Sequence, residues 1–246
     1  DVVAELEAVK NLRWLKFGGV QQQTFAIDNI YFYNKPIVID ENTDPTTLTN
    51  GAVCDVKFAR EMTVANGIWN TIALPFSMTA NQIANTFGAG TRVAKLQSTS
   101  TVASQNAINL VFAYVNELEA GTPYIILPTE TGNGAIIESV TINTTENPVV
   151  IEGQVTMHPV LKTISYNYSN GDPIKFFLSA DGDLHYNEAS NSIKALRAYF
   201  TFDNVTSIAA AAQVRARVVF NENEATGLDN LTTEDAPIKI MQNGQL

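Results

Sequence analysis

Apolar and polar residues alternate at every second position through most of this chain, which is the pattern of strands with one buried face. The alternating segments are rich in Val, Ile, Thr, Tyr and Phe, and Gly, Asn, Asp and Pro separate them. We predict strands over residues 13–17, 24–33, 52–63, 71–76, 92–97, 108–115, 123–128, 136–142, 149–156, 162–168, 175–178, 184–187, 195–202 and 213–220. Such frequent strands favour an all-β fold: an antiparallel β-sandwich, jelly-roll-like or immunoglobulin-like, built from one or two sandwich units.

Two stretches have helical character instead: a charged opening at residues 2–10 and a short segment at residues 80–86. Thr79 stands directly before the second segment. Its hydroxyl can accept a hydrogen bond from a free backbone amide, so we predict that Thr79 caps a helix there.

Three local patterns carry further structural expectations. The run Tyr124–Leu127 is continuously hydrophobic, which predicts burial on both faces, and Gly121 and Pro123 predict a turn leading into it. The segment 179–184 predicts a hairpin turn with Gly182 at positive φ, and this interpretation is preferred to a calcium loop. Arg197 lies between apolar neighbours, either as a buried cation paired with a carboxylate or, the preferred interpretation, as a strand residue with its head at the surface.

Two changes in composition suggest domain boundaries. Residues 34–50 hold prolines, acidic residues and a Thr cluster, which predicts a linker or long loop. Residues 221–237 are acidic and turn-rich, and a short apolar strand follows at residues 238–241. We therefore expect an N-terminal segment at 1–35, a β-sandwich body at 36–221, and a linker with the start of another element at 222–246.

The composition narrows the class of protein. Charged residues make up 16% of the 246 residues, the formal net charge is −10 and the pI is near 4.6. An acidic chain offers no basic surface for phosphates, so we expect no nucleic-acid partner. No apolar run approaches the roughly 20 residues of a membrane span. Cys54 is the only cysteine, which excludes an intrachain disulfide and a cysteine–histidine zinc set and predicts a buried strand residue.

Four short phrases follow one another along the chain: WNTIALPF at 69–76, AGTPY at 120–124, RAYF at 197–200 and TGL at 226–228. In this order they resemble a C-terminal β-rich module of uncharacterised secreted or surface proteins of gut Bacteroidetes. The resemblance covers about residues 50–230 and implies an extracellular or outer cell-surface location. The tail at 225–246 looks like the beginning of a sorting or surface-attachment segment, so we expect the chain to be a piece of a larger surface protein.

The segment 25–33 resembles the last strand of a galactose-binding-like jelly roll, either the end of such a domain or a strand absorbed into the sandwich. In that fold the acidic residue of the closing strand often helps to hold a structural calcium. Asp28 stands at this position, so the resemblance implies a weak candidate metal ligand. No other cofactor is expected.

The sequence offers no catalytic constellation that would predict an enzyme. His158 and His185 lie outside any metal or triad motif, and most acidic residues fall in predicted loops. We therefore expect a non-catalytic interaction or architectural module, for example an adhesion-like one, with a glycan or a surface protein as its candidate partner. An accessory part of a glycoside hydrolase is a further alternative, which would need a cleft with paired acids.

A carbohydrate-binding protein is the main alternative, because sugars stack on exposed aromatic rings. Tyr166 and Tyr168 lie two residues apart, so on one strand they share a face, and Asn167 and Asn170 stand beside them. These four residues are the candidate ligand-binding platform. The simpler interpretation is one more half-buried strand face.

Overall fold

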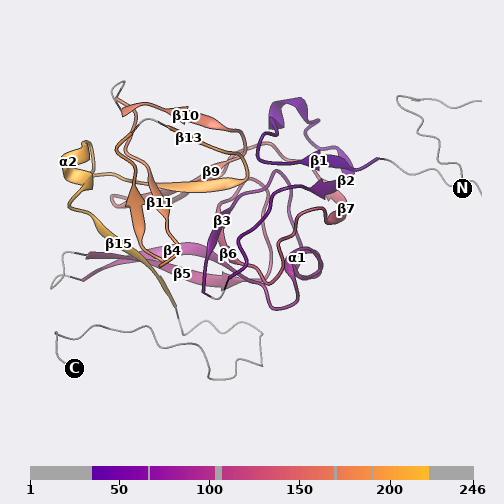
Figure 1. Cartoon of the computed structure of the whole chain (residues 1–246), viewed down its shortest axis with the longest axis horizontal. Coiled ribbons are helices and arrows are strands. Elements are labelled where there is room, and N and C mark those ends of the chain that lie inside the picture. Colours follow the sequence, from indigo (N-terminus) through magenta and orange to yellow (C-terminus); the bar gives the residue numbers. More distant parts are fainter. Residues whose placement is uncertain (1–34, 66, 103–106, 169–170, 190, 222–246) are drawn as a thin grey trace, which may run out of the picture. The chain divides into compact units, whose positions relative to one another are not determined.

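The computed structural model describes residues 35–65, 67–102, 107–168, 171–189 and 191–221. Contacts divide the chain into two units, Asp1–Tyr33 and Asn34–Leu246, and the described residues all belong to the second. Within that unit almost every regular element is a strand (Figure 1). The predicted all-β, sandwich-like fold is therefore confirmed, while the predicted strands at 13–17 and 24–33 and the helix at 2–10 lie outside the described residues.

Sheet 1 has five strands in the order β15-β5-β4-β6-β3. Its strands are β3 (Asn70–Ile72), β4 (Arg92–Val102), β5 (Ala107–Val115), β6 (Tyr124–Leu127) and β15 (Arg215–Phe220). All neighbouring pairs are antiparallel except β15, which runs parallel to β5. The parallel pair departs from the purely antiparallel prediction, because β15 reaches this edge by a long crossover through the other sheets.

Two further sheets pack against sheet 1 on opposite faces of β6: sheet 2 against one face of sheet 1, and sheet 3 against the other face at its β3–β6 end. Sheet 2 has the order β12-β11-β14-β9-β8 and sheet 3 the order β1-β2-β7. The strands of sheet 2 are β8 (Val149–Ile151), β9 (Val155–Val160), β11 (Phe176–Leu178), β12 (Leu184–Tyr186) and β14 (Arg197–Phe202). Those of sheet 3 are β1 (Ile37–Ile39), β2 (Val53–Phe58) and β7 (Ile136–Thr141), with β1 parallel to β2. A separate pair, β10 (Ile164–Tyr166) and β13 (Asn191–Ile193), lies on the outer side of sheet 2 (Figure 1).

The layers enclose separate hydrophobic cores, and β6 contributes to two of them. Tyr124 and Ile126 pack with sheet 3, while Ile125, on the opposite face of the same strand, packs with sheet 2. The whole run Tyr124–Leu127 is buried, as its continuous hydrophobicity predicts. Because alternate residues of one strand face opposite sides, only a strand between two covering layers needs apolar residues at every position.

The predicted helix is confirmed as α1 (Ala80–Phe87), and its first turn has the predicted cap. The Thr79 hydroxyl accepts from the backbone amide of Gln82, and the Gln82 side chain accepts from the backbone amide of Thr79. This reciprocal arrangement satisfies two amides that a helix start otherwise leaves unpaired. Ile83 and Phe87 anchor the helix in the core beneath sheet 3. A second short helix, α2 (Ile208–Ala211), was not predicted.

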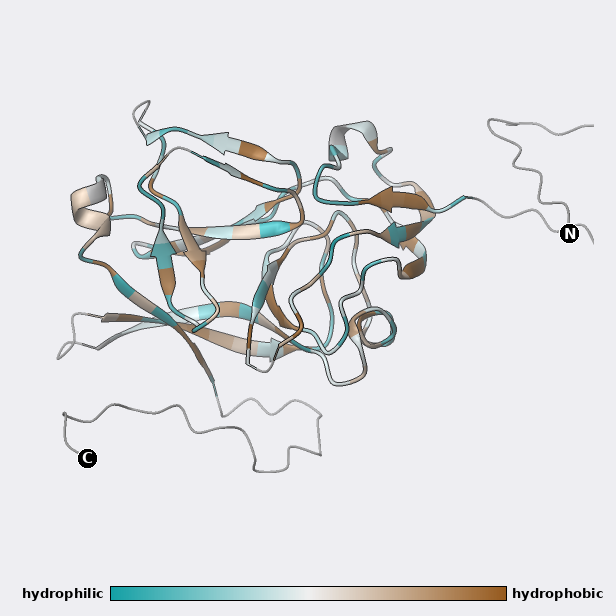
Figure 2. Ribbon diagram, viewed as in Figure 1, coloured by the Kyte–Doolittle hydropathy of each residue, from teal (hydrophilic) through white to brown (hydrophobic). Residues whose placement is uncertain are grey.

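The described part of residues 34–50, predicted as a linker or long loop, is mostly loop, but it packs against the body of the fold and so is not a linker. It contains β1 and a single 3-10 turn at Pro45–Thr47, and Ile39 is fully buried in the first core. Hydrophobic residues mark β1 in Figure 2. The signal was missed because β1 is short and gains its hydrogen bonds from β2, outside its own sequence neighbourhood. The hairpin between β11 and β12 is confirmed, with Gly182 at a φ of 84°.

A charge cluster joins the segment after β1 to sheets 1 and 2. It consists of Glu41, Arg60, Lys194 and Arg197. Glu41 accepts from Lys194 at 3.1 Å and from Arg197, and Arg60 Nε lies 3.8 Å from its carboxylate. Arg60 is only 3% exposed and donates to the carbonyls of Thr71, at 2.9 Å, and Leu196. The Arg197 side chain is 40% exposed, so it combines the two predicted alternatives: an ion pair and a head at the surface.

Burial perturbs the charged groups of this cluster in opposite senses. Burial, and then the neighbouring Arg197, lowers the pKa of Arg60 to about 9, so its guanidinium remains charged at neutral pH. Burial alone would raise the pKa of Glu41, but the hydrogen bond from Lys194 and the charge of Arg197 lower it below its ordinary value. Glu41 is therefore an ionised carboxylate that balances a buried cation.

Candidate functional site

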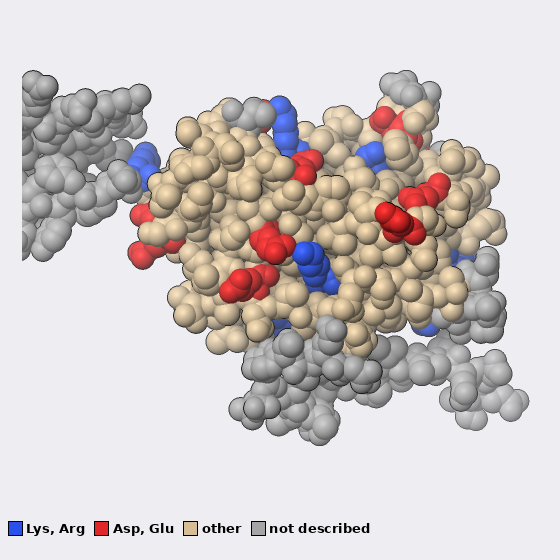
Figure 3. Space-filling model, turned by 180° about the vertical axis from the view of Figure 1, so that it is seen from behind, with Lys and Arg blue, Asp and Glu red and all other residues tan. Residues whose placement is uncertain are grey.

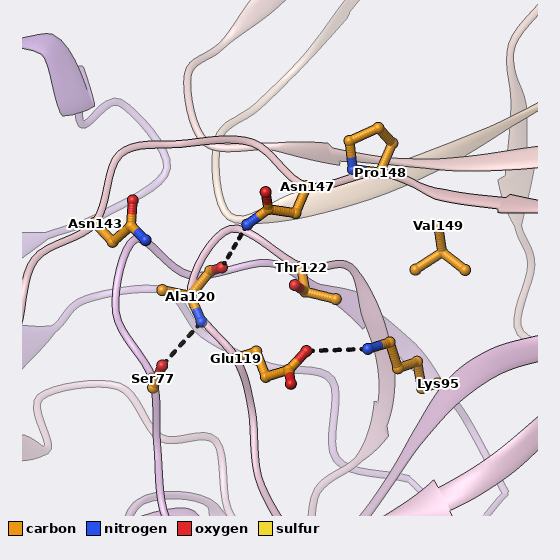
Figure 4. A pocket seen from close by; sticks show the side chains of 9 residues that line it. All are labelled: Ser77, Lys95, Glu119, Ala120, Thr122, Asn143, Asn147, Pro148 and Val149. Atoms are coloured by element: carbon orange, nitrogen blue, oxygen red, sulfur yellow. Dashed lines mark hydrogen bonds and ion pairs between the residues drawn. The ribbon is translucent and has the colours of Figure 1, made fainter.

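A pocket of about 460 Å³ opens where sheet 1 meets the segment leading into β8. Separate segments of the chain form its walls, and Figure 4 shows their side chains converging on one space. The lining residues are Ser77, Lys95, Glu119, Ala120, Thr122, Asn143, Asn147, Pro148 and Val149. The volume lies in the range of roughly 300–1,000 Å³ that is usual for small-molecule sites, and the lining is more polar than in most of them. We refer to it as the Lys95–Glu119 pocket.

The AGTPY turn builds the floor of this pocket, and Gly121 determines its shape. Gly121 has a φ of 71°, and a Cβ atom on it would stand 1.8 Å from the carbonyl oxygen of Thr145. Its amide donates to the Leu74 carbonyl at 2.7 Å, and its carbonyl accepts from the Asn147 amide at 3.0 Å. Only glycine allows the segment before β8 to lie this close to the turn. The turn therefore fixes one wall of the pocket against the other.

One ion pair supplies both formal charges of the lining. Lys95 Nζ lies 3.0 Å from Glu119 Oε2, and the buried Tyr124 hydroxyl donates to the same oxygen at 3.4 Å. The hydrogen bond and the charge of Lys95 lower the pKa of Glu119 below its ordinary value. Burial raises the pKa of Tyr124 to about 12, so the phenol stays neutral and available as a donor. Glu119, whose side chain is 68% exposed, is therefore an ionised acceptor at the mouth of the pocket.

Amide and hydroxyl side chains hold the rest of the rim in place. Asn147 Nδ2 donates to the Ala120 carbonyl at 3.2 Å, and the Ala120 amide donates to Ser77 Oγ at 3.0 Å (Figure 4). Asn143 Oδ1 accepts from the Thr145 amide at 3.0 Å. Each of these polar side chains is tied to backbone, so its position is set before any ligand arrives.

Three of the four predicted platform residues, Tyr166, Asn167 and Tyr168, lie elsewhere, on the outer side of sheet 2. The Tyr166 and Tyr168 rings are in contact, with centroids 5.0 Å apart, and the Asn167 amide donates to Asp172 at 2.6 Å. Tyr166 is only 4% exposed, because it packs with Val160 and Ile193 in a third core. Tyr166 therefore fits the simpler interpretation, a strand face packed against a core, and not the exposed ring that the carbohydrate-binding alternative needs.

Asn170 and Asp28 lie outside the described residues. A ligand-binding role for the two tyrosines and Asn167 stays a prediction, as does a calcium site at Asp28. Within the described ranges, no group of His, Cys, Asp and Glu side chains is arranged to hold a metal ion.

A buried lysine, which the sequence pattern did not predict, lies beside Tyr166 and Tyr199. Lys175 is 6% exposed, and its Nζ lies 5.4 Å from the Tyr166 ring centroid and 5.1 Å from that of Tyr199. Burial lowers the pKa of Lys175. The ammonium group thus occupies the space between the two aromatic faces, where a cation–π interaction offsets part of its desolvation.

Neither histidine belongs to the pocket. His158 stacks on Tyr199 and shares a hydrogen bond of 2.9 Å with Thr201, and burial lowers its pKa. His185 is exposed, 3.9 Å from Asp181 on the β11–β12 hairpin. Both occupy structural or surface positions in the sheets, as their sequence contexts predict.

The fold places the described part of the chain among all-β, sandwich-like proteins. Comparison with models of known protein families, with curated proteins and with solved structures finds no match for this chain. Among the residues that the structure describes, no helix has the length and apolar character needed to cross a membrane. The pocket itself therefore provides the basis for a functional proposal.

Proposed function

We propose that this chain is a non-catalytic interaction module of a secreted or cell-surface bacterial protein, and that it holds its partner in the Lys95–Glu119 pocket. The observation that carries the proposal is the preformed polar lining. Ser77, Asn147 and the Lys95–Glu119 pair are already held by hydrogen bonds to the turn and to one another. A rigid lining avoids the ordering cost that flexible side chains add to binding.

The electrostatics of Glu119 favour binding over catalysis. Lys95 lowers the pKa of this carboxyl, so the group is ionised and accepts hydrogen bonds. A glycosidase acid needs the opposite, a raised pKa that keeps its proton at neutral pH. Glu119 is therefore suited to hold a ligand by its hydroxyl or amide hydrogens and poorly suited to protonate a leaving group.

Separate observations support the proposed secreted or cell-surface location. The ordered phrases at 69–76, 120–124, 197–200 and 226–228 resemble modules of secreted and surface proteins, and only 16% of the residues are charged. On the face that Figure 3 shows, charged side chains are few and scattered among uncharged ones. A surface built largely from uncharged polar residues suits an extracellular β protein that binds by hydrogen bonds.

Blocking the pocket tests the proposal directly. The labelled full chain is applied to a printed panel of glycans and bacterial surface proteins, beside two variants with a tryptophan at an exposed serine. Ser77→Trp fills the rim of the pocket, whereas Ser98→Trp on β4 is the matched control outside the lining. We expect at least about tenfold weaker binding for Ser77→Trp only. Equal binding by both variants, or chemical turnover of the captured probe, would contradict the proposal.

A further inference from the structure

The hydrogen-bonding capacity of the Lys95–Glu119 pocket exceeds the bonds that its side chains make with one another. The Lys95 ammonium group carries three donors, of which Glu119 accepts one at 3.0 Å. The Glu119 carboxylate can accept about four bonds, and Lys95 and Tyr124 provide two. Ser77 Oγ accepts from the Ala120 amide and retains its own hydrogen as a donor. The pocket therefore offers both donors and acceptors to a ligand, which matches a ligand whose groups each donate and accept.

The charges of the lining cancel, which argues for a neutral ligand. Lys95 and Glu119 are the charged residues among the lining side chains, and they form one ion pair. The chain as a whole has a net charge of −10, so its long-range field repels anions. A carboxylate or sulfate in the pocket would also face the ionised Glu119. A cation would have to compete with Lys95 for the same carboxylate.

An apolar surface completes the pocket opposite the ion pair. Pro148 and Val149 lie across the space from Glu119 and Lys95 (Figure 4). A sugar ring has hydroxyl groups around its edge and a C–H face that is apolar, so one ring can satisfy both walls at once. A compact ion or a purely polar metabolite would leave the Pro148–Val149 surface solvated.

We infer that the Lys95–Glu119 pocket takes a neutral pyranose unit of a glycan. This inference rests on the proposed function and specifies the chemical class of its partner. Vicinal hydroxyls bridge Glu119 and Lys95, a further hydroxyl reaches Asn147 or Ser77, and the ring's C–H face lies on Pro148 and Val149. The roughly 12 heavy atoms of one hexose, at the usual efficiency per atom, correspond to a dissociation constant on the order of 1 mM. Further units of the glycan strengthen binding.

Calorimetric titration of the full chain with defined tetrasaccharides tests the ligand class. The probes are neutral tetrasaccharides of glucose, mannose and galactose, a galacturonate tetrasaccharide as the anionic match, and a neutral tetrapeptide. Glu119→Gln removes the charged acceptor but keeps the side-chain size. Glu61→Gln makes the same change at an exposed position outside the pocket. We expect a neutral tetrasaccharide to bind, with about tenfold or greater loss in Glu119→Gln and no change in Glu61→Gln.

Salt dependence provides a second readout. Binding of a neutral sugar should change little between 50 mM and 500 mM salt, because no charged ligand group is screened. If only galacturonate or the peptide binds, and Ser77→Trp abolishes that binding, the neutral-sugar inference is overturned while the proposed binding site stands. If no probe binds, the neutral-sugar inference is overturned, and the panel experiment with Ser77→Trp decides the proposed function separately. If probes bind and neither Glu119→Gln nor Ser77→Trp weakens any binding, both proposals are overturned.

Discussion

The turn at Gly121 can be tested by adding one methyl group, because the chain contains a matched glycine elsewhere. Gly121 and Gly153 both have a φ of 71°. A Cβ atom on Gly121 would lie 1.8 Å from the Thr145 carbonyl oxygen and 3.2 Å from Asn147 Nδ2, whereas one on Gly153 would meet nothing within 4 Å. The two alanine substitutions therefore share the backbone strain and differ in the steric clash.

The expected losses follow from these contacts. The left-handed conformation costs an alanine about 1–2 kcal/mol at either position, offset in part by the lower entropy of the unfolded chain. At Gly121 the clash adds about 1–3 kcal/mol, since the opposing atom belongs to backbone and must move with its segment. Weakening the bond from Asn147 N to the Gly121 carbonyl, 3.0 Å long, adds about 1 kcal/mol. We expect a loss of about 3–5 kcal/mol for Gly121→Ala and about 1 kcal/mol for Gly153→Ala.

Urea denaturation followed by far-ultraviolet circular dichroism measures both losses from the midpoints, provided that the slopes agree. Gly121→Ala should also weaken ligand binding, since the clash displaces Asn147 from the rim of the pocket. Equal destabilisation by the two substitutions would refute the reasoning, because the contact with Thr145 would then contribute nothing. Gly153→Ala should leave ligand binding unchanged.

Three further predictions follow from the charges and the pocket. Glu41→Gln leaves the buried Arg60 without its carboxylate, so the free energy of unfolding at pH 7 should fall by about 3 kcal/mol. The control is Asp44→Asn, which breaks the more exposed ion pair with Lys162 and should cost less than about 1 kcal/mol. The folded-state pKa of Glu41 is lowered, so its contribution to stability is fully present above pH 4.5 and is lost as the pH falls through the folded pKa. An acid titration in which the difference in unfolding free energy between wild type and Glu41→Gln stays constant would contradict this. Burial disfavours the charged form of Lys175 and so lowers its pKa, and Lys175→Met should therefore match or exceed wild-type stability at pH 7. The difference in stability should shrink as the pH rises toward 10.5, where the lysine loses its charge. Thermal melts of both proteins at pH 7 and pH 10 measure it. A bound neutral tetrasaccharide at ten times its dissociation constant should raise the free energy of unfolding by about 1.4 kcal/mol, and a melting temperature that does not move would exclude that ligand.

Features that depend on neighbouring residues could be predicted from the sequence. The cap at Thr79 needs only Gln82, three residues away, and the turn at Gly182 needs only a residue that tolerates positive φ. The double burial of Tyr124–Leu127 follows from hydrophobicity at every position of one strand. In each case the structure depends on residues within one short segment, so the sequence of that segment is enough to predict it.

Features that depend on distant partners could not be predicted in this way. Periodicity places Tyr166 on one face of a strand, but its burial depends on β13 and on Lys175. Likewise, the strand β1 becomes regular only by pairing with β2. The Lys95–Glu119 pocket draws its side chains from separate segments, and no local spacing relates them. The local pattern of hydrophobic and polar residues does not predict which surface a distant segment will cover.

The two arginines of the charge cluster show why residue type alone did not settle their roles. Arg197, in the RAYF phrase, drew attention because apolar residues flank it, yet its side chain is 40% exposed. Arg60 lies in the predicted strand at 52–63, where an alternating pattern does not mark a buried cation, and it is the buried member. Its position follows from the carbonyls of Thr71 and Leu196, which meet only after sheets 1 and 2 have packed. Burial of that cation then requires Glu41, so the segment that resembles a linker becomes necessary to the core.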